Sequence, residues 1–338
     1  MSKQQVSHKI KRVREMICDG VFEGGGVKGI GHVGAVYALE EAGYKFERVA
    51  GSSAGAIVSA LIAAGYSGRE MKELMTSVDY LKFREEDGLD KLGNIGKFFS
   101  VLFHYGIYSA DYLERWLNAL LKEKHACCFG DVKLSDGSYR LQVTSVDLTT
   151  QKLLVFPRDF IQFHIDIDSF PIARAVRMSM SIPIFYEPYR LKDAKGNVHY
   201  MVDGGMLSNY PIWILDDGES ITDHPVFGFR FVNNEDCSCR QAMKPCHNVI
   251  DYAKLMVSTL VDAKDNFFLM RSKGDCKRSV FIPSDVHIDG QAVNISATDF
   301  DISKAESESL FQNGYEAGKR FAQTFDFQNW SRIYRSHE

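Results

Sequence analysis

Residues 46–64 read Phe46-Glu-Arg-Val-Ala-Gly-Ser-Ser-Ala-Gly-Ala-Ile-Val-Ser-Ala-Leu-Ile-Ala-Ala64, and their pattern changes from strand to helix at the centre. Phe46–Gly51 predicts a short strand, and Ala54–Ala64 predicts an apolar helix. Gly51-Ser52-Ser53-Ala54-Gly55 lies at the junction and fits the pattern G-x-S-x-G. This context is typical of a nucleophile elbow, a tight turn that holds a serine hydroxyl clear of the backbone. Ser53 is therefore the candidate nucleophile.

A second glycine-rich turn, Gly24-Gly25-Gly26-Val27-Lys28-Gly29, lies between a predicted strand over residues 17–22 and a predicted helix over residues 29–42. Glycines let several backbone N–H groups point to one side, and a helix N-terminus adds positive potential. Such a turn binds a negative oxygen, either of a phosphate or of a tetrahedral acyl intermediate. Alone it also fits the dinucleotide pattern G-x-G-x-x-G, with Glu47 about 20 residues downstream for a ribose. A nucleotide-binding protein is therefore one alternative.

A serine nucleophile needs a base, because its hydroxyl is almost fully protonated at neutral pH. Three histidines lie late enough in the chain for a Ser–Asp–His order: His224, His247 and His287. None of them follows a strand with a suitable acid before it, so no triad is predicted. Asp203 ends a predicted strand over residues 198–202 and precedes Gly204-Gly205, which lets another backbone or a substrate approach its carboxylate. Asp203 is the candidate base, although an ordinary Asp-Gly turn has the same local sequence.

Strand and helix patterns alternate along the rest of the chain, which predicts a single α/β domain with a mainly parallel sheet. Further helices are expected at residues 68–77, 111–121, 172–180, 249–268 and 303–325, and further strands at residues 139–146, 152–156, 226–232 and 279–282. Residues 79–109 fit neither pattern.

The composition excludes several classes of protein. The 338 residues include 40 Lys and Arg against 44 Asp and Glu, a net charge of −4, and 45% are hydrophobic. This balance is typical of a folded globular chain and argues against a nucleic-acid binder. No apolar run approaches the roughly 18 residues that span a bilayer, and the N-terminus lacks a signal-peptide pattern. Seven cysteines without framework spacing indicate reduced thiols and a cytoplasmic protein.

Together the motifs resemble those of the patatin-like phospholipase family of serine lipid acyl hydrolases. The family's three marks stand here in order as Gly24–Gly29, Gly51–Gly55 and Asp203–Gly205. Ala175–Pro183 is similar to the segment ahead of the family's catalytic Asp strand, and Asn209-Tyr210-Pro211 matches the residues that follow it. The similarity covers about residues 18–232. Glu23 departs from the Asp that many members have before the glycines.

The resemblance implies a three-layer α/β/α fold and a Ser–Asp dyad that needs no metal or cofactor. Ser53 would be the nucleophile and Asp203 the base, and the N–H groups of Gly25 and Gly26 would form the oxyanion hole. The remaining motif glycines would shape the turns: Gly24, Gly29, Gly51, Gly55, Gly204 and Gly205. The expected substrate is a phospholipid or a related acyl lipid, with the ester position, head group and chain length left open. A catalytically silent lipid-binding scaffold is the second alternative.

The domain boundaries follow from this assignment. We expect a basic N-terminal extension over residues 1–17, a catalytic domain over residues 18–325 and a C-terminal tail over residues 326–338. Within the domain, residues 79–109 are the candidate for a cap over an acyl channel.

Two further features bear on partners. The apolar patch Phe98–Phe103 and the basic segment Lys9–Arg14 are candidates for peripheral contact with a membrane surface. No zinc site is expected, because the spacing of the following residues matches no usual zinc pattern: Cys237, Cys239, Cys246 and His247. Nothing in the sequence indicates a protein partner.

Overall fold

The computed structural model describes residues 15–84, 104–216, 222–232, 273–288 and 291–335, together with residues 252 and 256. Several predictions concern residues outside these ranges: the Lys9–Arg14 segment, residues 85–103 of the candidate cap with its Phe98–Phe103 patch, almost all of the predicted helix 249–268, and Cys237, Cys239, Cys246 and His247.

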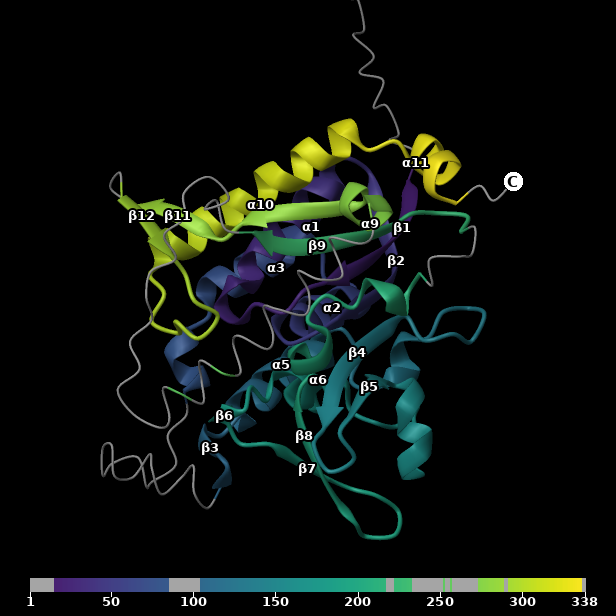
Figure 1. The fold of residues 1–338 in the computed structure, drawn as a ribbon, viewed down its shortest axis with the longest axis vertical. Coiled ribbons are helices and arrows are strands. Elements are labelled where there is room, and N and C mark those ends of the chain that lie inside the picture. Colours follow the sequence, from purple (N-terminus) through teal and green to yellow (C-terminus); the bar gives the residue numbers. More distant parts are fainter. Residues whose placement is uncertain are drawn as a thin grey trace, which may run out of the picture.

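In the described part of the chain, eight strands form a mixed and mostly parallel sheet (Figure 1). The strands run across the sheet in the order β10 (Ser279–Pro283), β9 (Val226–Val232), β1 (Met16–Phe22), β2 (Tyr44–Gly51), β4 (Leu141–Asp147), β8 (Val198–Asp203) and β7 (Tyr189–Lys192), and β5 (Lys152–Phe156) pairs with β4. Pairing is parallel from β10 through to β4, whereas β5 and β8 run antiparallel to β4 and β7 runs antiparallel to β8. The prediction of a mainly parallel sheet is confirmed.

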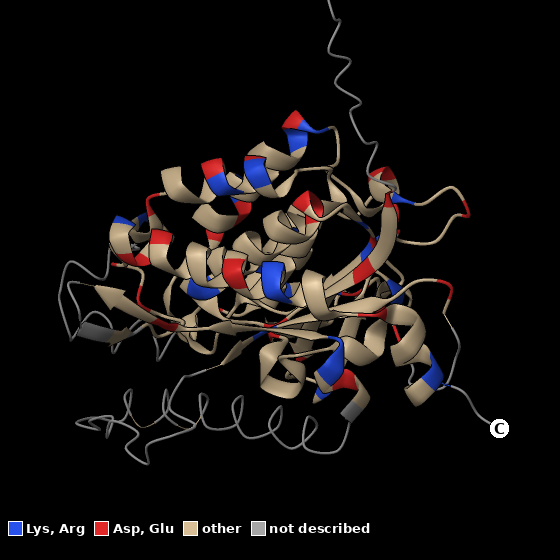
Figure 2. Ribbon diagram, turned by 90° about the horizontal axis from the view of Figure 1, so that it is seen from above, with Lys and Arg blue, Asp and Glu red and all other residues tan. Residues whose placement is uncertain are grey.

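Helices cover both faces of this sheet, which gives the predicted three-layer α/β/α arrangement (Figure 2). The longer helices are α1 (Gly29–Glu41), α2 (Ala54–Ala63), α3 (Gly68–Ser77), α5 (Asp111–Glu123), α6 (Ile172–Met180) and α10 (Lys304–Thr324). Helix α10 packs along α1 with α3 beside them, while α2 packs on β2 and on α6 (Figure 1). Every residue of α2 is buried, as its continuous apolar sequence predicts.

Local sequence fixes where α3 and α10 begin. Helix α3 starts at a capping box in which Ser67 Oγ accepts from the Glu70 N–H and the Glu70 carboxylate accepts from the Ser67 N–H at 2.8 Å. Ser303 and Glu306 repeat this arrangement at the start of α10. Each box satisfies N–H groups that the first helical turn leaves without partners, so the starts of both helices are encoded locally.

The smaller elements have no counterpart among the elements predicted from the sequence. They are β3 (Gly106–Tyr108), β6 (Ile184–Tyr186), β11 (Asp285–Ile288), β12 (Gln291–Asn294), α7 (Gly205–Ser208), α9 (Lys273–Lys277), α11 (Phe327–Tyr334) and the 3₁₀ turns η1 (Gly26–Lys28), η2 (Tyr80–Phe83), η4 (Phe129–Val132), η5 (Arg158–Phe163) and η6 (Ile212–Ile214). The expected C-terminal tail thus includes a helix, and its Trp330 is buried with the indole N–H donating to the Gly274 carbonyl at 2.9 Å.

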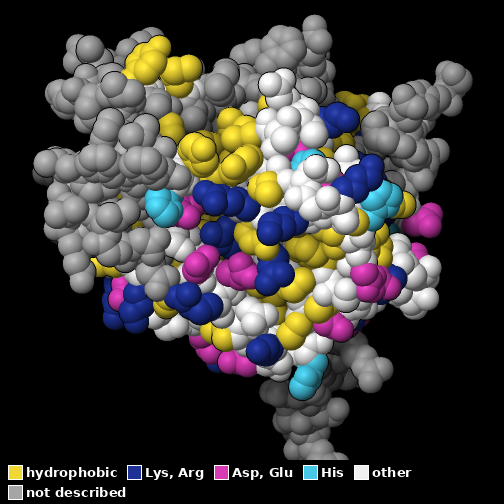
Figure 3. All heavy atoms as spheres, turned by 90° about the horizontal axis from the view of Figure 1, so that it is seen from below, with side chains coloured by type: hydrophobic (Ala, Val, Ile, Leu, Met, Phe, Trp, Pro, Cys, Tyr) yellow, Lys and Arg dark blue, Asp and Glu magenta, His cyan; other side chains and the backbone are white. Residues whose placement is uncertain are grey.

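Two observations concern contact with a membrane: the length and hydropathy of the helices, and the side chains on one face of the molecule. No helix in the described ranges is both long enough and apolar enough to cross a bilayer. On the face seen from below, apolar and basic side chains lie next to one another (Figure 3).

Candidate active site

Ser53 lies at the junction of β2 and α2, as predicted, and its backbone is strained. Its φ of +52° and ψ of −125° fall in a region that residues with a side chain rarely adopt. The turn closes tightly, because the Ser52 N–H donates to the Phe22 carbonyl at 3.2 Å. A Cβ on Gly55 would overlap that same carbonyl oxygen, and one on Gly51 would overlap the Gly55 backbone. The small residues of G-x-S-x-G are therefore a steric requirement of this elbow.

The register of the sheet brings Asp203 to the same level as the elbow. Gly51 pairs with Val143 of β4, and Asp203 pairs with Ser145, two residues farther along that strand. Because β8 runs antiparallel to β4, the chain reaches this level only at the last residue of β8. The Ser53 hydroxyl lies close enough to the Asp203 carboxylate to lower its pKa. The structure thus joins two candidates that lie 150 residues apart in the sequence.

The environment of Asp203 favours a base that titrates near neutral pH. The residue is 5% exposed, and burial raises the pKa of its carboxyl to about 6. Hydrogen bonds from Ser53 and from the Gly205 N–H, the latter at 2.7 Å, favour the ionised form but do not outweigh the burial. A carboxylate with a pKa close to the working pH accepts and returns a proton more readily than an ordinary Asp.

The end of α6 connects the two candidates. Ser179 Oγ accepts from the Ser53 N–H at 2.9 Å, and the Ser181 carbonyl accepts from the Asp203 N–H at 2.9 Å. Met180 lies between them in sequence, and its Sδ is 3.5 Å from Ser53 Oγ. The segment that resembles the family's sequence ahead of the catalytic Asp is therefore a brace between the elbow and β8.

The glycine-rich turn passes beside Ser53. A Cβ on Gly24 would lie 3.0 Å from Ser53 Cβ, and one on Gly29 would lie 3.3 Å from Ala54 Cβ. Gly26 has a φ of +56°, and a Cβ there would overlap the Ala297 carbonyl, so only glycine fits. Among the described residues, no backbone carbonyl outside the turn accepts from the N–H of Gly25 or Gly26. These two amides are available to a ligand oxygen.

Two polar residues hold this turn in place, and sequence reasoning gave neither of them that role. The buried Glu23 carboxylate accepts from the Phe231 N–H at 2.6 Å and from Arg230 Nε at 3.2 Å. Asn209 accepts the Gly24 N–H on its backbone carbonyl at 3.0 Å, and its amide donates to Glu23 at 3.3 Å. The available signal concerned Asn209 alone, which stands in the Asn-Tyr-Pro motif shortly after Asp203.

The remaining candidates are the two glycines after Asp203 and the late histidines. Gly204 packs against Thr144 of β4, and Gly205 lies beside the Asp203 carboxylate. His224 lies 3.2 Å from Asp19 and 3.9 Å from Glu47, and His287 is exposed. No triad histidine is thus present among the described late histidines.

The nucleotide alternative loses its ribose contact in the structure. Glu47 lies four residues before the end of β2, roughly 13 Å from the turn at the strand's C-terminus. Its group with Asp19 and His224 brings three potential ligand atoms within 4.8 Å of one another. The Arg48 side chain already binds the Asp19 carboxylate, with Nε donating at 2.9 Å, and its positive charge would repel a cation. The residues therefore do not fit a metal ion.

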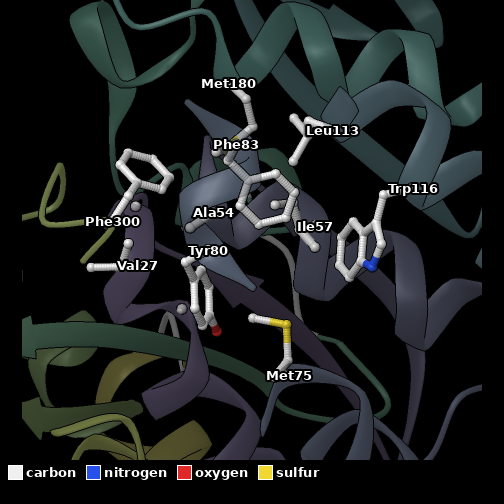
Figure 4. Close-up of a pocket in the computed structure, with 12 residues that line it drawn as sticks. Val27, Ala54, Ile57, Met75, Tyr80, Phe83, Leu113, Trp116, Met180 and Phe300 are labelled. Atoms are coloured by element: carbon white, nitrogen blue, oxygen red, sulfur yellow. The ribbon is translucent and has the colours of Figure 1, made fainter. Parts of the chain in front are cut away.

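An apolar pocket adjoins the candidate dyad (Figure 4). Its lining comes from the glycine-rich turn, α2, α3, η2, α5, α6 and the loop before α10: Gly26, Val27, Gly29, Ala54, Ile57, Met75, Tyr80, Phe83, Leu113, Trp116, Met180 and Phe300. Met180, Gly26 and Ala54 place one side of this pocket against Ser53. Tyr80 and Phe83 belong to the predicted cap region, so part of that region forms the pocket wall.

Comparison with known proteins agrees with this arrangement. The model of a family described as patatin-like phospholipase matches residues 20–216. The uncharacterized protein YqhO of Bacillus subtilis (strain 168) is 36% identical over 316 residues, covering 94% of this chain and all of YqhO. The uncharacterized protein R571 of Acanthamoeba polyphaga mimivirus is 25% identical and covers 88% of this chain and 91% of R571. The crystal structure of VipD from Legionella pneumophila has the same fold, with a TM-score of 0.51 at 17% identity, covering 96% of this chain and 70% of VipD.

Proposed function

The chain belongs to the patatin-like phospholipase family, and on that premise we propose that it hydrolyses the carboxylic esters of phospholipids or related acyl lipids through an acyl-Ser53 intermediate. Family membership assigns the chain to the lipid hydrolases. The observation that carries the finer proposal is a strained, buried serine next to a buried aspartate with a raised pKa, beside an apolar pocket.

In the first half of the reaction, Asp203 takes the Ser53 hydroxyl proton as Oγ attacks the ester carbonyl carbon. The carbonyl π electrons move to the oxygen, and the Gly25 and Gly26 N–H groups stabilise the resulting oxyanion. The tetrahedral intermediate then collapses: the bond to the leaving alcohol breaks, and Asp203 returns its proton to that oxygen. The acyl group remains esterified to Ser53.

In the second half, Asp203 acts as the base again. It takes a proton from a water molecule, which attacks the acyl carbon, and the oxyanion forms in the same hole. Collapse breaks the bond to Ser53 Oγ, which recovers the proton from Asp203, and the free fatty acid leaves. One carboxylate with a pKa of about 6 serves all four proton transfers, so the mechanism needs no histidine.

The pocket accounts for the acyl part of the substrate. Its side chains are aliphatic, aromatic or thioether apart from the Tyr80 hydroxyl and the Trp116 indole N–H, and each methylene buried there stabilises the complex by about 0.8 kcal/mol. Because Met180 lines the pocket and contacts Ser53, an acyl chain in the pocket presents its carboxyl end to the nucleophile. Such a lining offers a nucleotide no charged side chain.

The experiment compares hydrolysis of a medium-chain p-nitrophenyl ester and of a mixed-chain phosphatidylcholine by wild type, Ser53→Ala and Asp203→Asn. Ser59→Ala is the matched control, because Ser59 is also buried on α2 and its hydroxyl has no described partner. We expect both dyad variants to lose at least about 10³-fold in kcat/KM and the control to keep its activity. Activity that survives Ser53→Ala would refute the proposal. Identifying the released fatty acid and lysolipid reports which ester is cleaved.

A further inference from the structure

The β7–β8 hairpin extends past the level of the catalytic elbow. Gly51, at the elbow, pairs with Val143 of β4. Asp147 lies four residues farther along β4 and pairs with Met201 of β8, roughly 13 Å beyond the elbow at about 3.3 Å per residue. The rest of the hairpin, residues 189–200, lies farther out still (Figure 1). The hairpin therefore projects from the edge of the sheet at which the nucleophile lies.

One face of this hairpin combines basic and aromatic side chains. Arg190 and Tyr200 are cross-strand partners, and Lys192 lies on the same face because it is two residues along β7 from Arg190. The Arg190 guanidinium is 6.0 Å from the centre of the Tyr200 ring. Tyr105, which is 53% exposed, packs edge-on against Tyr200 with 5.8 Å between ring centres. The exposed Leu148 adjoins them, since its N–H donates to the Tyr200 carbonyl at 2.9 Å. These five residues form what we call the hairpin face.

The charges of the hairpin are unbalanced. Residues 189–200 contain the three cations Arg190, Lys192 and Lys195 and the single acid Asp193. All three cations are exposed, and none of them has an ion-pair partner in the described part of the chain. The Asp193 carboxylate is already engaged in the turn, where it accepts from the Lys195 N–H at 2.9 Å and the Asn197 N–H at 2.8 Å. The hairpin thus presents a net positive charge to solvent.

A lipid surface with anionic head groups fits both properties of the hairpin face. Cationic side chains are attracted to such a surface, and the amphipathic rings of tyrosines lie favourably at the level of the head groups. The view from below looks toward the hairpin and shows basic and apolar side chains next to one another (Figure 3). An acidic protein would also satisfy the charge, but a lipid surface in addition brings acyl esters to the edge of the sheet that carries Ser53.

We propose that the hairpin face docks the protein on lipid surfaces that carry anionic head groups. This inference rests on the proposed function, because an acyl-lipid substrate is what makes docking at this edge useful. Each Lys or Arg close to an anionic bilayer strengthens binding about fivefold. The three cations of the hairpin therefore predict a preference for anionic over neutral vesicles on the order of a hundredfold.

The test measures binding of the full chain to phosphatidylcholine vesicles with and without phosphatidylglycerol, by co-sedimentation. The Ser53→Ala background keeps the lipids intact. Reversing two charges with Arg190→Glu and Lys192→Glu should weaken binding to the anionic vesicles at least about tenfold. The matched control is Lys319→Glu with Arg320→Glu, an exposed pair on α10 at the other end of the molecule, and it should bind like the parent (Figure 1).

The aromatic part is tested separately. Tyr105→Asn should weaken binding to the anionic vesicles at least about threefold. Asn suits this position, because the residue has a φ of +66°, which Asn adopts more readily than most side chains. In the Ser53 background, all hairpin variants should hydrolyse water-soluble p-nitrophenyl butyrate with an unchanged kcat/KM, which shows that they fold and that the catalytic centre is intact.

The outcomes separate this inference from the proposed function. Docking is refuted if the parent binds no anionic vesicles, if the hairpin charge reversal weakens binding no more than the control pair does, or if Tyr105→Asn binds unchanged. Hydrolysis of the butyrate ester that depends on Ser53 would keep the proposed function in each of these cases. If wild type hydrolyses no ester, the proposed function fails, whereas vesicle binding needs no catalysis and still reports on the hairpin face.

Discussion

Replacing Asp203 by Asn should stabilise the fold while abolishing the reaction. Burial raises the pKa of Asp203 from 3.8 to about 6, so the folded protein holds the ionised carboxylate less favourably than the unfolded chain does. Asn is neutral at every pH and can still accept from the Gly205 N–H and donate to Ser53. The variant therefore resembles the protonated wild type.

The sign and size follow from proton linkage. Below the unfolded pKa of 3.8, Asp203 is protonated in both the folded and the unfolded state, and its burial does not lower the free energy of unfolding. This contribution to stability is lost as the pH rises through the folded pKa of about 6. Above that pH the loss is complete and amounts to about 3 kcal/mol, at 1.36 kcal/mol for each pKa unit. Asp203→Asn should thus gain about 3 kcal/mol, or roughly 5 °C in Tm, at pH 8 and gain nothing at pH 4.

The assay is thermal unfolding of both proteins from pH 4 to pH 8. Asp147→Asn is the matched control, because Asp147 is a buried aspartate on the adjoining strand β4 with the opposite electrostatics. Burial would raise its pKa, but hydrogen bonds from Thr150, His199 and the Thr149 N–H lower it overall. Asp147→Asn should lose stability at pH 8. If Asp203→Asn also loses stability at pH 8, Asp203 is not a carboxyl with a raised pKa and the reasoning is refuted.

Three further outcomes are expected. The kcat/KM of wild type should rise with pH through about 6, because Asp203 must be ionised to act as the base; a profile flat from pH 5 to 8 would contradict this. Gly55→Ala should lower the free energy of unfolding by about 1–3 kcal/mol, measured with denaturant, and should remove most of the activity, because the added Cβ meets the Phe22 carbonyl. Gly29→Ala should have a smaller effect on both, and equal effects of the two variants would argue against the close approach at Gly55. Leu113→Trp should fill the pocket and slow hydrolysis of long-chain esters at least about tenfold relative to butyrate esters, and an unchanged chain-length profile would place the acyl chain elsewhere.

The sequence was sufficient for elements whose signals are local. The helix over residues 172–180 and the strands over residues 152–156 and 226–232 have the predicted bounds, because each is a strongly periodic or apolar run between clear turn residues. The elbow was also predictable, since small residues and a strand-to-helix change coincide at Ser53. Short pieces such as β3 and β6 were missed because three residues carry no period, and their pairing depends on tertiary contacts.

The site was less predictable where it depends on long-range pairing. Nothing local shows that Asp203 pairs with Ser145, yet this register brings the carboxylate to the elbow. The role of Glu23 was equally hidden, because its partners Phe231 and Arg230 lie more than 200 residues away. The family resemblance supplied the Ser–Asp pair, whereas the pocket could be found only in the folded chain.

The most direct test of the central claim is to identify the residue that a fluorophosphonate probe labels. Such probes react with a serine that a neighbouring base activates, so peptide mass spectrometry of the labelled protein reports the nucleophile itself. The mechanism predicts one probe per chain on Ser53, no labelling of Ser53→Ala, and much slower labelling of Asp203→Asn. A wild-type protein that hydrolyses acyl esters but carries the probe on another serine would contradict the account.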